Sequence, residues 1–307
     1  MKSRTGVCVA RQFIALALTA FNVVMFASAA PVTDPAYRAS VEKWRHAYET
    51  DLKSDHGWLS VSGLFWLHDG ENTFGSGPLN DIVLPTPAPA SAGSFEFHSG
   101  RTVVHVKPGV PATIGGKRLD SAEMRPDSGA DQLVLGDLTL YVHSSGERFT
   151  IRLRDKNSPL RKSFTGTRWF PVDKSYRVVG KFVPYDQPKP IEIQNVMGDT
   201  LHETILGYVA FKLAGKDLRL DVDANSGEVE FVFRDLTSGH ETYAASRFLD
   251  TTIAPDGKVV LDFNEAYNPP CAYNPYTTCP LPPPQNRLNL RIAAGEKTYH
   301  HAATAEH

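Results

Sequence analysis

Hydrophobic residues near the start of the chain recur every three or four positions. Val41, Trp44, Tyr48 and Leu52 fall on one stripe of a helix. Thr33-Asp34-Pro35 precedes the stripe and supplies a capping side chain and a proline for the first turn. We therefore predict a helix over about 36–53. It packs on the body of the protein through Trp44, and its outward positions are Glu42, Lys43, Arg45 and Glu49. A partner-binding helix is the alternative.

From Gly57 onward the helical period is lost and short alternating segments follow, separated by Gly-rich turns. Phe95 alternates with Phe97, and Val104 with Val106, as in half-buried strands. Val229–Phe233 is predicted to pair with Leu218–Val222 across a turn over 223–227. About a dozen such segments stand against one helix. The predicted fold class is all-β, with two β-sandwich-like domains and one N-terminal amphipathic helix.

The predicted organisation has six parts, of which the first is an export signal. It comprises a signal peptide (1–29), the N-terminal helix (30–56), a first β-sandwich (57–120), a polar linker (121–130), a C-terminal β domain (131–299) and a tail (300–307). The signal peptide is indicated by basic residues before an apolar run, Phe13 to Phe26, and by Ala27-Ser28-Ala29, a cleavage pattern. An uncleaved membrane anchor is the alternative.

The predicted export affects the net charge of the protein, its compartment and the partners that it can bind. At 41% hydrophobic and 21% charged residues, the composition is that of an ordinary globular protein. Removal of residues 1–29 takes away three basic residues and changes the formal net charge from −2 to −5, with 29 Lys and Arg against 34 Asp and Glu. A mildly acidic protein has no electrostatic reason to bind nucleic acid. We expect a periplasmic or secreted protein, with cleavage after Ala29 and no stable membrane insertion afterwards.

The stretch Leu261–Leu288 (LDFNEAYNPPCAYNPYTTCPLPPPQNRL), here called the Pro-rich loop, is a candidate binding loop. Its prolines exclude a helix and a central strand, and it is rich in Asn, Tyr and acidic residues. Cys271 and Cys279 lie within it, and in an exported protein a disulfide between them is the first expectation.

Polar residues at the ends of predicted strands indicate a site beside this loop. We predict a pocket that brings together Arg152, Arg247, Asp155, Asp235 and Asp262. Such groups could hold an anionic or sugar-like ligand, or tune one Asp for acid/base work. The alternative is a set of internal ion pairs and turns that fix the loops. No cofactor and no metal site is predicted, because Asp221-x-Asp223-x-Asn225 lacks the glutamate of a calcium loop and His202-Glu203 lacks the second histidine of a zinc protease motif.

Two family resemblances bear on these interpretations. The run "FGSGPLNDIVLP … GSFEFHSGRTVVHV … TIGGKRL" resembles the forkhead-associated sandwich, a phosphothreonine-binding fold. Gly75 and Asn80–Leu84 match its pattern, whereas Ser76 replaces the arginine that clamps phosphate. Phosphopeptide binding is therefore a remote alternative.

The second resemblance covers nearly all of the chain after the signal. The phrases GWLSVSGLFWL, NDIVLP, FRDLTSG..TY..SRFL, LDFNEAYNPPCAYNPYTTCPLPPPQNRL and AAGEK resemble a bacterial family known as domain of unknown function 1684. It implies a mostly-β protein and brings no activity. The motif positions are Arg152, Asp155, Asp235, Thr237, Tyr243, Arg247, Asp262, Asn264, Cys271, Cys279 and Asn286. Relatives that look cytosolic carry the two cysteines, so a reduced thiol pair stays open.

The predicted function is a ligand-binding or structural module whose ligand is a small or anionic molecule. The candidate binding residues are Arg152, Asp155, Thr237, Tyr243, Arg247, Asn264 and Asn286. The alternative is a hydrolase-type enzyme that uses Asp262 or Asp235 as base, with help from Tyr267, Arg152 or Arg247.

Overall fold

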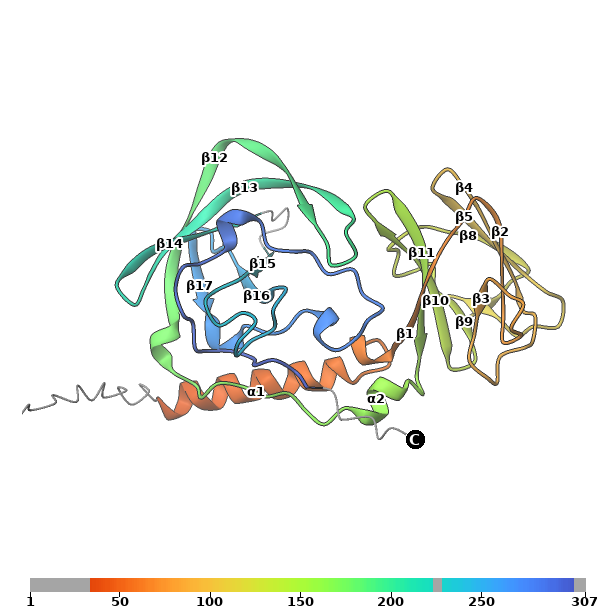
Figure 1. Cartoon of the computed structure of the whole chain (residues 1–307), viewed down its shortest axis with the longest axis horizontal. Helices are drawn as coiled ribbons and strands as arrows, with labels where there is room; N and C mark the ends of the chain where they lie inside the picture. Colours follow the sequence, from red (N-terminus) through yellow and green to blue (C-terminus); the bar gives the residue numbers. More distant parts are fainter. Residues whose placement is uncertain (1–33, 223–227, 301–307) are drawn as a thin grey trace, which may run out of the picture. The chain divides into compact units, whose positions relative to one another are not determined.

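The computed structural model of the protein describes residues 34–222 and 228–300 (Figure 1). The predicted signal peptide, the predicted turn over 223–227 and tail residues 301–307 lie outside this part. Within it the chain forms mainly antiparallel β-sheets, and the predicted all-β class is confirmed.

Helix α1 (Pro35–Leu52) begins and ends within a residue of the predicted bounds. The Asp34 carboxylate caps it by accepting the amides of Ala36 and Tyr37. Trp44 packs against Trp169, with ring centroids 5.9 Å apart. Arg45, predicted to face outward, is buried, and it donates to the Asn264 carbonyl while its guanidinium covers the Trp169 ring. The outward prediction was wrong because the aliphatic part of an arginine can be covered while its head finds an acceptor.

After a 3-10 turn, η1 (Trp58–Ser60), the first β region consists of two sheets. The six-stranded sheet has the order β1-β11-β10-β9-β6-β7 and the five-stranded sheet the order β3-β2-β4-β5-β8. The bounds are β1 (Val61–Trp66), β2 (Gly70–Gly75), β3 (Ile82–Val83), β4 (Gly93–His98), β5 (Arg101–Val106), β6 (Thr113–Ile114), β7 (Lys117–Arg118), β8 (Ser121–Met124), β9 (Leu133–Leu135), β10 (Leu138–Ser145) and β11 (Arg148–Asp155). Inward-facing residues of both sheets, among them Phe74, Phe95 and Leu140, form one core.

The predicted linker 121–130 begins with a strand instead. β8 pairs with β5, and Met124 lies fully buried in the core of the two sheets. The first β region also continues beyond this point, because β9, β10 and β11 belong to the same sheet as β1. The polar composition was misleading because β8 lies at the edge of its sheet, where one face of the strand is exposed.

The second β region carries long, curved strands. β12 (Arg177–Gln194) and β13 (Thr200–Leu213) form a hairpin, and the sheet order is β14-β13-β12-β17, with β14 (Lys216–Val222) and β17 (Lys258–Asp262) at its edges. A two-stranded sheet contains β15 (Glu228–Phe233) and β16 (Arg247–Thr252). Short helices α2 (Pro159–Ser163), η2 (Lys174–Tyr176), η3 (Phe263–Glu265), η4 (Pro270–Ala272) and η5 (Pro284–Asn286) lie in the connections.

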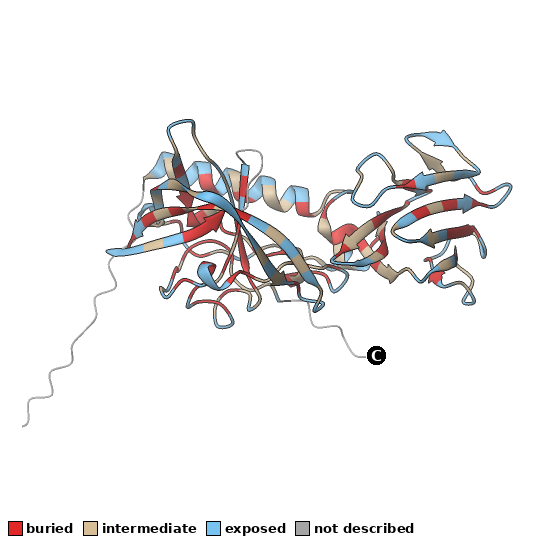
Figure 2. Ribbon diagram, turned by 90° about the horizontal axis from the view of Figure 1, so that it is seen from above, coloured by how far each residue is buried: buried red, intermediate tan, exposed pale blue. Residues whose placement is uncertain are grey.

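The predicted hairpin between Leu218–Val222 and Val229–Phe233 was wrong. β14 pairs with β13, whereas β15 pairs with β16. Leu220, Val222, Phe231 and Phe233 all lie in one buried core, so the two strands meet through their side chains and not through their backbones. Alternating apolar patterns on both segments fit either arrangement, because each strand buries one face in both cases. Figure 2 shows buried residues in red along the strands of the described chain.

The two β regions are tied together by polar contacts. Asp199, at the end of the β12–β13 hairpin, accepts hydrogen bonds from Ser145 Oγ (2.7 Å) and from Arg148 Nε (2.6 Å) at the tip of β10–β11. Asn274 of the Pro-rich loop donates to the Val61 carbonyl at 2.7 Å. The contacts of Asp199 hold the β12–β13 hairpin beside β10 and β11, and the contact of Asn274 holds the loop beside β1.

Candidate functional site

Asp235 and Arg247, two members of the predicted pocket, form a closed ion pair. Arg247 Nη1 lies 2.5 Å from Asp235 Oδ2, and both side chains are at most 1% exposed. Arg247 also donates to the carbonyls of Ile292 and Ala294, while Asp235 accepts the amides of Thr237 and Ile292. Asp235 borders a smaller cavity with Arg234 and Leu236, but its side chain is 0% exposed and is held in the ion pair. Asp235 therefore has no access to a ligand on which it could act as a base.

Four further candidates have local structural contacts. Asp155 accepts the amide of Asn157 in a turn. Thr237 Oγ1 lies 2.8 Å from Thr242 Oγ1. Tyr243 donates to the Cys271 carbonyl. Asn286 bridges β14 and β15, because it accepts the amide of Asp221 and donates to the carbonyls of Asp221 and Val232. These contacts fix loops and strand ends, as the alternative interpretation of the polar residues expected.

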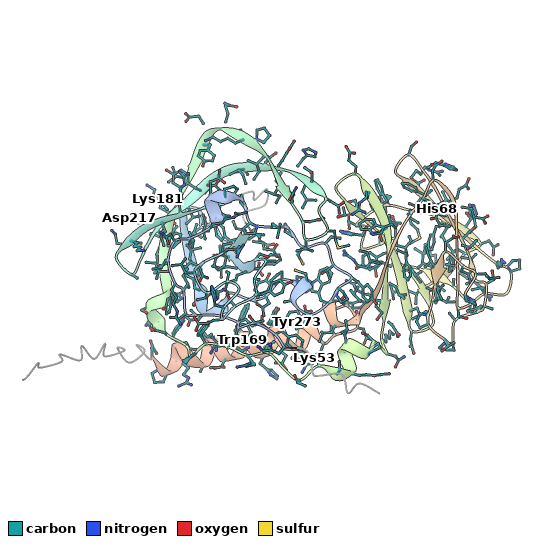
Figure 3. The ribbon with its side chains drawn as sticks, in the orientation of Figure 1. Lys53, His68, Trp169, Lys181, Asp217 and Tyr273 are labelled. Carbon is teal, nitrogen blue, oxygen red and sulfur yellow. The ribbon has the colours of Figure 1, made fainter. Side chains whose placement is uncertain are left out.

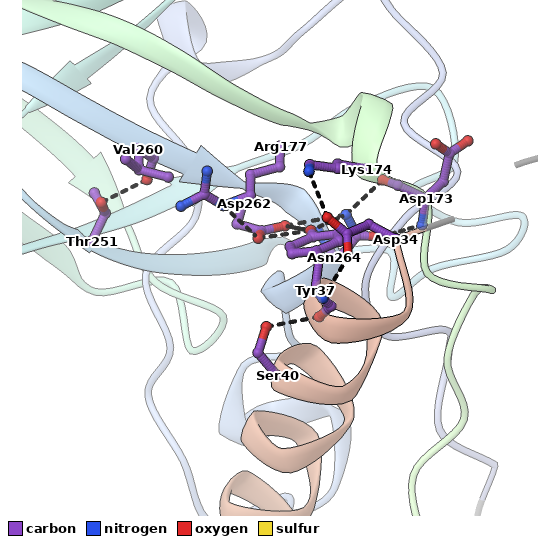
Figure 4. A network of polar contacts seen from close by, with 10 residues as sticks. All are labelled: Asp34, Tyr37, Ser40, Asp173, Lys174, Arg177, Thr251, Val260, Asp262 and Asn264. Atoms are coloured by element: carbon purple, nitrogen blue, oxygen red, sulfur yellow. Dashed lines mark hydrogen bonds and ion pairs between the residues drawn. The ribbon is translucent and has the colours of Figure 1, made fainter. Parts of the chain in front are cut away.

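Asp262 lines an open cavity of about 840 Å³, here called the Asp262 cavity, between the start of α1 and strands β15, β16 and β17. Both of its oxygens accept from the Tyr37 hydroxyl (2.7 and 2.8 Å), and Arg177 Nε lies 3.4 Å away (Figure 4). Asn264 completes the network through contacts with Asp262, Tyr37 and the Asp173 backbone. The network joins the helix to β17.

The Asp262 cavity is acidic. Glu228, Glu230, Asp250 and Glu265 line it together with Asp262. Burial and the neighbouring Asp262 charge raise the pKa of Glu265 to about 7. Burial raises the pKa of Asp250 as well. A ligand would here meet carboxylates, and Asp262 is already engaged with Tyr37 and Arg177.

A second cavity, of about 420 Å³ and here called the Arg152 cavity, lies where the two β regions meet α1 and the Pro-rich loop. Tyr48 comes from α1, Trp58 from η1, His143 from β10 and Arg152 from β11. The Pro-rich loop contributes Tyr267, Tyr273, Thr277, Thr278 and Cys279. Figure 3 labels Tyr273 beside α1. Of the five residues predicted to share a pocket, Arg152 alone lines this cavity. The shared pocket is therefore not formed.

Arg152 is 4% exposed, and no carboxylate among the described residues pairs with it. Its Nη2 lies 3.3 Å from Thr278 Oγ1, and its buried Nε has no hydrogen-bond partner in the described part of the chain. The guanidinium lies over the rings of Trp58 and Tyr141, with 5.4 and 5.9 Å to their centroids. Cation–π contacts compensate part of the lost hydration but leave the positive charge without a counter-charge.

Thr278 is the centre of a chain of hydrogen bonds. Its Oγ1 lies 2.8 Å from His143 Nε2, and His143 Nδ1 lies 2.5 Å from Asp127 Oδ1. Asp127 sits in the turn between β8 and β9, and its other oxygen accepts the amide and hydroxyl of Ser144. Burial opposes ionisation of Asp127, but the hydrogen bonds from His143 and Ser144 outweigh it and lower its pKa to about 2.

The opposite wall of the Arg152 cavity is formed by β15, β16 and Tyr267. The Tyr267 hydroxyl donates to Glu230 (3.2 Å) and to Asp250 (3.0 Å). Phe248 from β16 adds an apolar face. One wall therefore carries a cation and the other carries carboxylates, with aromatic rings between them.

Cys271 and Cys279 are free thiols in the structure. The Cys271 amide donates to Cys279 Sγ at 3.1 Å. Contact with the Cys279 thiol lowers the pKa of Cys271, and the same contact, followed by burial, raises the pKa of Cys279. The adjacent thiols are compatible with a reduced pair and with a pair that oxidises later, so the disulfide stays a prediction.

A buried carboxyl, Glu296, lies behind the Arg152 cavity. It accepts from the Tyr273 hydroxyl and from the Asn268 amide, and burial raises its pKa to about 8. Tyr48 links the cavity wall to this group, because its hydroxyl lies 3.3 Å from the Tyr273 hydroxyl.

Across residues 34–222 and 228–300, no cluster of three or more His, Cys, Asp or Glu side chains is placed to hold a metal ion. In the same part of the chain, no helix has the length and apolar character needed to cross a membrane.

The sequence interpretation missed Asp127, His143 and Thr278. They are 16 and 135 positions apart along the chain and match no compact catalytic motif. Thr278 lies in the Pro-rich loop, which was predicted to bind a ligand, but a threonine there carries no charge or spacing that indicates a nucleophile. Only the turn sequence Pro126-Asp127-Ser128-Gly129 could have drawn attention to Asp127.

Comparison with known proteins gives two findings. The profile of the family described as "Protein of unknown function (DUF1684)" matches residues 162–297. An uncharacterized protein of Haloarcula marismortui, solved by solution NMR, is 31% identical, with 45% of this chain and 79% of that chain covered and a TM-score of 0.38. No curated protein matches the chain. The resemblance to the forkhead-associated sandwich stays a prediction. Residues 162–297 therefore match the DUF1684 family, which is described as a protein of unknown function.

Proposed function

We propose that the protein binds a small organic carboxylate in the Arg152 cavity. The observation that carries this proposal is the buried Arg152 guanidinium, which faces a cavity and has no carboxylate partner among the described residues. A buried charge without a counter-charge is costly, and a carboxylate accepts a guanidinium fork through two parallel hydrogen bonds.

The remaining lining defines the rest of the ligand. Trp58, Tyr48, Tyr273 and Phe248 offer ring faces for an aliphatic or aromatic body. The volume of about 420 Å³ lies at the small end of the range for ligand pockets. Glu230 and Asp250 on the far wall would repel a second negative charge. The best fit is a monocarboxylate with a short apolar body.

Calorimetric titration with 3-phenylpropionate tests this proposal, with the neutral 3-phenylpropanamide as the matched ligand. We expect the acid to bind and the amide to bind at least tenfold more weakly, since the amide lacks the charge-assisted hydrogen bonds. Arg152→Met should weaken binding of the acid by about tenfold to a hundredfold.

Arg154→Met is the control. Arg154 lies two residues along the same strand and covers the Tyr141 ring, but it does not line the Arg152 cavity. Its replacement should leave the affinity within about threefold, because no direct contact is lost. Equal binding of acid and amide, or an Arg152→Met variant with unchanged affinity, would contradict carboxylate binding.

We further propose that the protein is exported to the periplasm or secreted. The support is the basic, apolar and Ala-x-Ala pattern of residues 1–29. Fractionation of a bacterial host that expresses the full chain, with N-terminal sequencing and thiol counting of the denatured product, tests it. We expect an N-terminus at Ala30. A cytosolic product that retains Met1 would refute export, and two free thiols in the exported protein would exclude the disulfide.

A further inference from the structure

We propose that Thr278, His143 and Asp127 form a nucleophile–base–acid triad that hydrolyses carboxylic esters in the Arg152 cavity. This inference rests on the proposed carboxylate binding, because the acid that hydrolysis releases belongs to the ligand class assigned to the cavity.

The three side chains have the mutual geometry that nucleophilic catalysis requires. Thr278 Oγ1 lies 2.8 Å from His143 Nε2, and His143 Nδ1 lies 2.5 Å from Asp127 Oδ1. A nucleophile in contact with one nitrogen of an imidazole, and a carboxylate on the other, is the arrangement by which unrelated hydrolases activate a hydroxyl. Thr278 and His143 line the cavity, whereas Asp127 lies behind the imidazole.

The hydrogen bonds determine which imidazole nitrogen can accept a proton. The depressed pKa of Asp127, about 2, means that its carboxylate is ionised near neutral pH and only accepts hydrogen bonds. In the neutral imidazole, the proton must therefore sit on Nδ1. The lone pair of Nε2 then faces the Thr278 hydroxyl and can take its proton.

Asp127 is held so that it orients the ring. One oxygen contacts His143, while the other accepts the amide and the hydroxyl of Ser144 at 3.1 and 2.7 Å. The backbone of Asp127 has a φ of +55°, a left-handed conformation that costs energy for a residue other than glycine. Its amide donates to the Val142 carbonyl, which ties the turn to the strand that carries His143.

Other histidine–carboxylate pairs in the described part of the chain differ from this one. The rings of His68, His98, His105 and His202 are 47–68% exposed, and none lines the Arg152 cavity. The His143 ring is 16% exposed. The four exposed histidines are explained as members of surface ion pairs. That explanation does not cover His143, which is mostly buried and also contacts the Thr278 hydroxyl inside a cavity.

Arg152 supplies the positive charge that the reaction needs. Its Nη2 lies 3.3 Å from Thr278 Oγ1. Attack of this oxygen on an ester carbonyl develops negative charge on the carbonyl oxygen close to the nucleophile, where a preorganised donor is most effective. The same guanidinium would hold the carboxylate product.

Each step balances without an oxidant or reductant. Thr278 Oγ1 bonds to the acyl carbon while its proton moves to His143 Nε2. The bond from the acyl carbon to the leaving oxygen breaks, and that oxygen takes the proton and departs as an alcohol. Water then attacks the acyl carbon and gives its proton to His143, the bond to Thr278 breaks, and Oγ1 regains a proton as the carboxylic acid leaves.

Hydrolysis of the p-nitrophenyl ester of 3-phenylpropionic acid tests the triad. We expect Thr278→Val, which removes only the hydroxyl function at nearly constant volume, and His143→Gln to lower kcat at least about a hundredfold. Thr278→Ser should keep activity within about tenfold of wild type, because it retains the hydroxyl nucleophile. Binding of 3-phenylpropionate to Thr278→Val should change by less than about threefold.

Two matched controls lie outside the triad. Thr251→Val removes a hydroxyl that donates to the Val260 carbonyl, and His105→Gln removes an imidazole paired with the Glu96 carboxylate. Both should leave kcat/KM unchanged within about twofold. If Thr278→Val retains more than a tenth of the wild-type kcat, the triad is overturned.

Covalent labelling of wild type provides a test that needs no variant to fold. An alkyl phosphonofluoridate should form a P–O bond with Thr278 Oγ1 as fluoride leaves, and peptide mass spectrometry should place the added mass on Thr278. A wild type that binds 3-phenylpropionate but neither hydrolyses the ester nor is labelled refutes the triad alone. A wild type that hydrolyses the ester without measurable affinity for the acid refutes the proposed binding function alone.

Discussion

Arg152 and Arg247 are both buried arginines on β-strands, yet their surroundings differ. Arg247 is paired with Asp235 and donates to two carbonyls, and it lines neither the Arg152 cavity nor the Asp262 cavity. Arg152 contacts one hydroxyl and two aromatic rings and lines a cavity. The comparison teaches that a buried charge without a counter-charge marks a candidate site, whereas the Asp235 carboxylate already neutralises the Arg247 charge.

The largest expected effect on the free energy of unfolding comes from breaking the Arg247–Asp235 ion pair. Arg247→Met leaves the Asp235 carboxylate buried and unpaired, so we expect the free energy of unfolding to fall by about 3–5 kcal/mol. Arg152→Met strands no carboxylate, and its stability should stay within about 1 kcal/mol of wild type. Urea unfolding followed by fluorescence measures both. Similar losses of unfolding free energy in the two variants would contradict the claim that only Arg247 is part of a buried ion pair.

A second effect, which depends on pH, concerns Glu296, a buried carboxyl near Arg247. The pKa of Glu296 is about 8 in the folded protein, above the ordinary value of 4.5, so from about pH 4.5 to 8 the folded state binds more protons than the unfolded state. Stability attributable to Glu296 is therefore complete below pH 4.5 and is lost as pH rises through 8, by at most about 1.4 kcal/mol per pH unit.

Urea unfolding at a series of pH values tests this dependence, with two matched variants. Glu296→Gln should remove the part of the decline that extends to pH 8. Glu265→Gln should remove only a part that ends near pH 7, because the pKa of Glu265 is about 7. A wild-type stability that rises between pH 5 and 8, or a Glu296→Gln variant with the wild-type slope, would contradict the assignment.

The smallest expected effect concerns the network of the Asp262 cavity. Tyr37→Phe removes the hydroxyl that contacts both Asp262 oxygens, so we expect the free energy of unfolding to fall by about 1 kcal/mol. The affinity for 3-phenylpropionate should not change. Ser40→Ala removes an exposed hydrogen bond to the Tyr37 carbonyl and should change stability by less than about 0.5 kcal/mol. Loss of carboxylate binding in Tyr37→Phe would move the ligand site to the Asp262 cavity.

The candidate site was predictable only in part. Arg152 and the Pro-rich loop were selected from the sequence, and both line the same cavity. Asp235 and Arg247 were selected on the same grounds of residue type and position at strand ends, but they form an internal pair. Residue type gives the charge of a group. It does not reveal whether another buried group neutralises that charge.

The sequence by itself determined the elements whose causes are local. The helix over Pro35–Leu52 follows from the Asp34 cap and a stripe of period 3.6, and the β class follows from alternation between Gly-rich turns. Tertiary structure alone decided that β15 pairs with β16 and that β8 completes a sheet, because alternating strands accept several partners with similar local energy. It also decided the contact between Asp127, His143 and Thr278. That contact joins a turn, a strand and a loop, whose proximity depends on how the sheets pack and on no pattern along the chain.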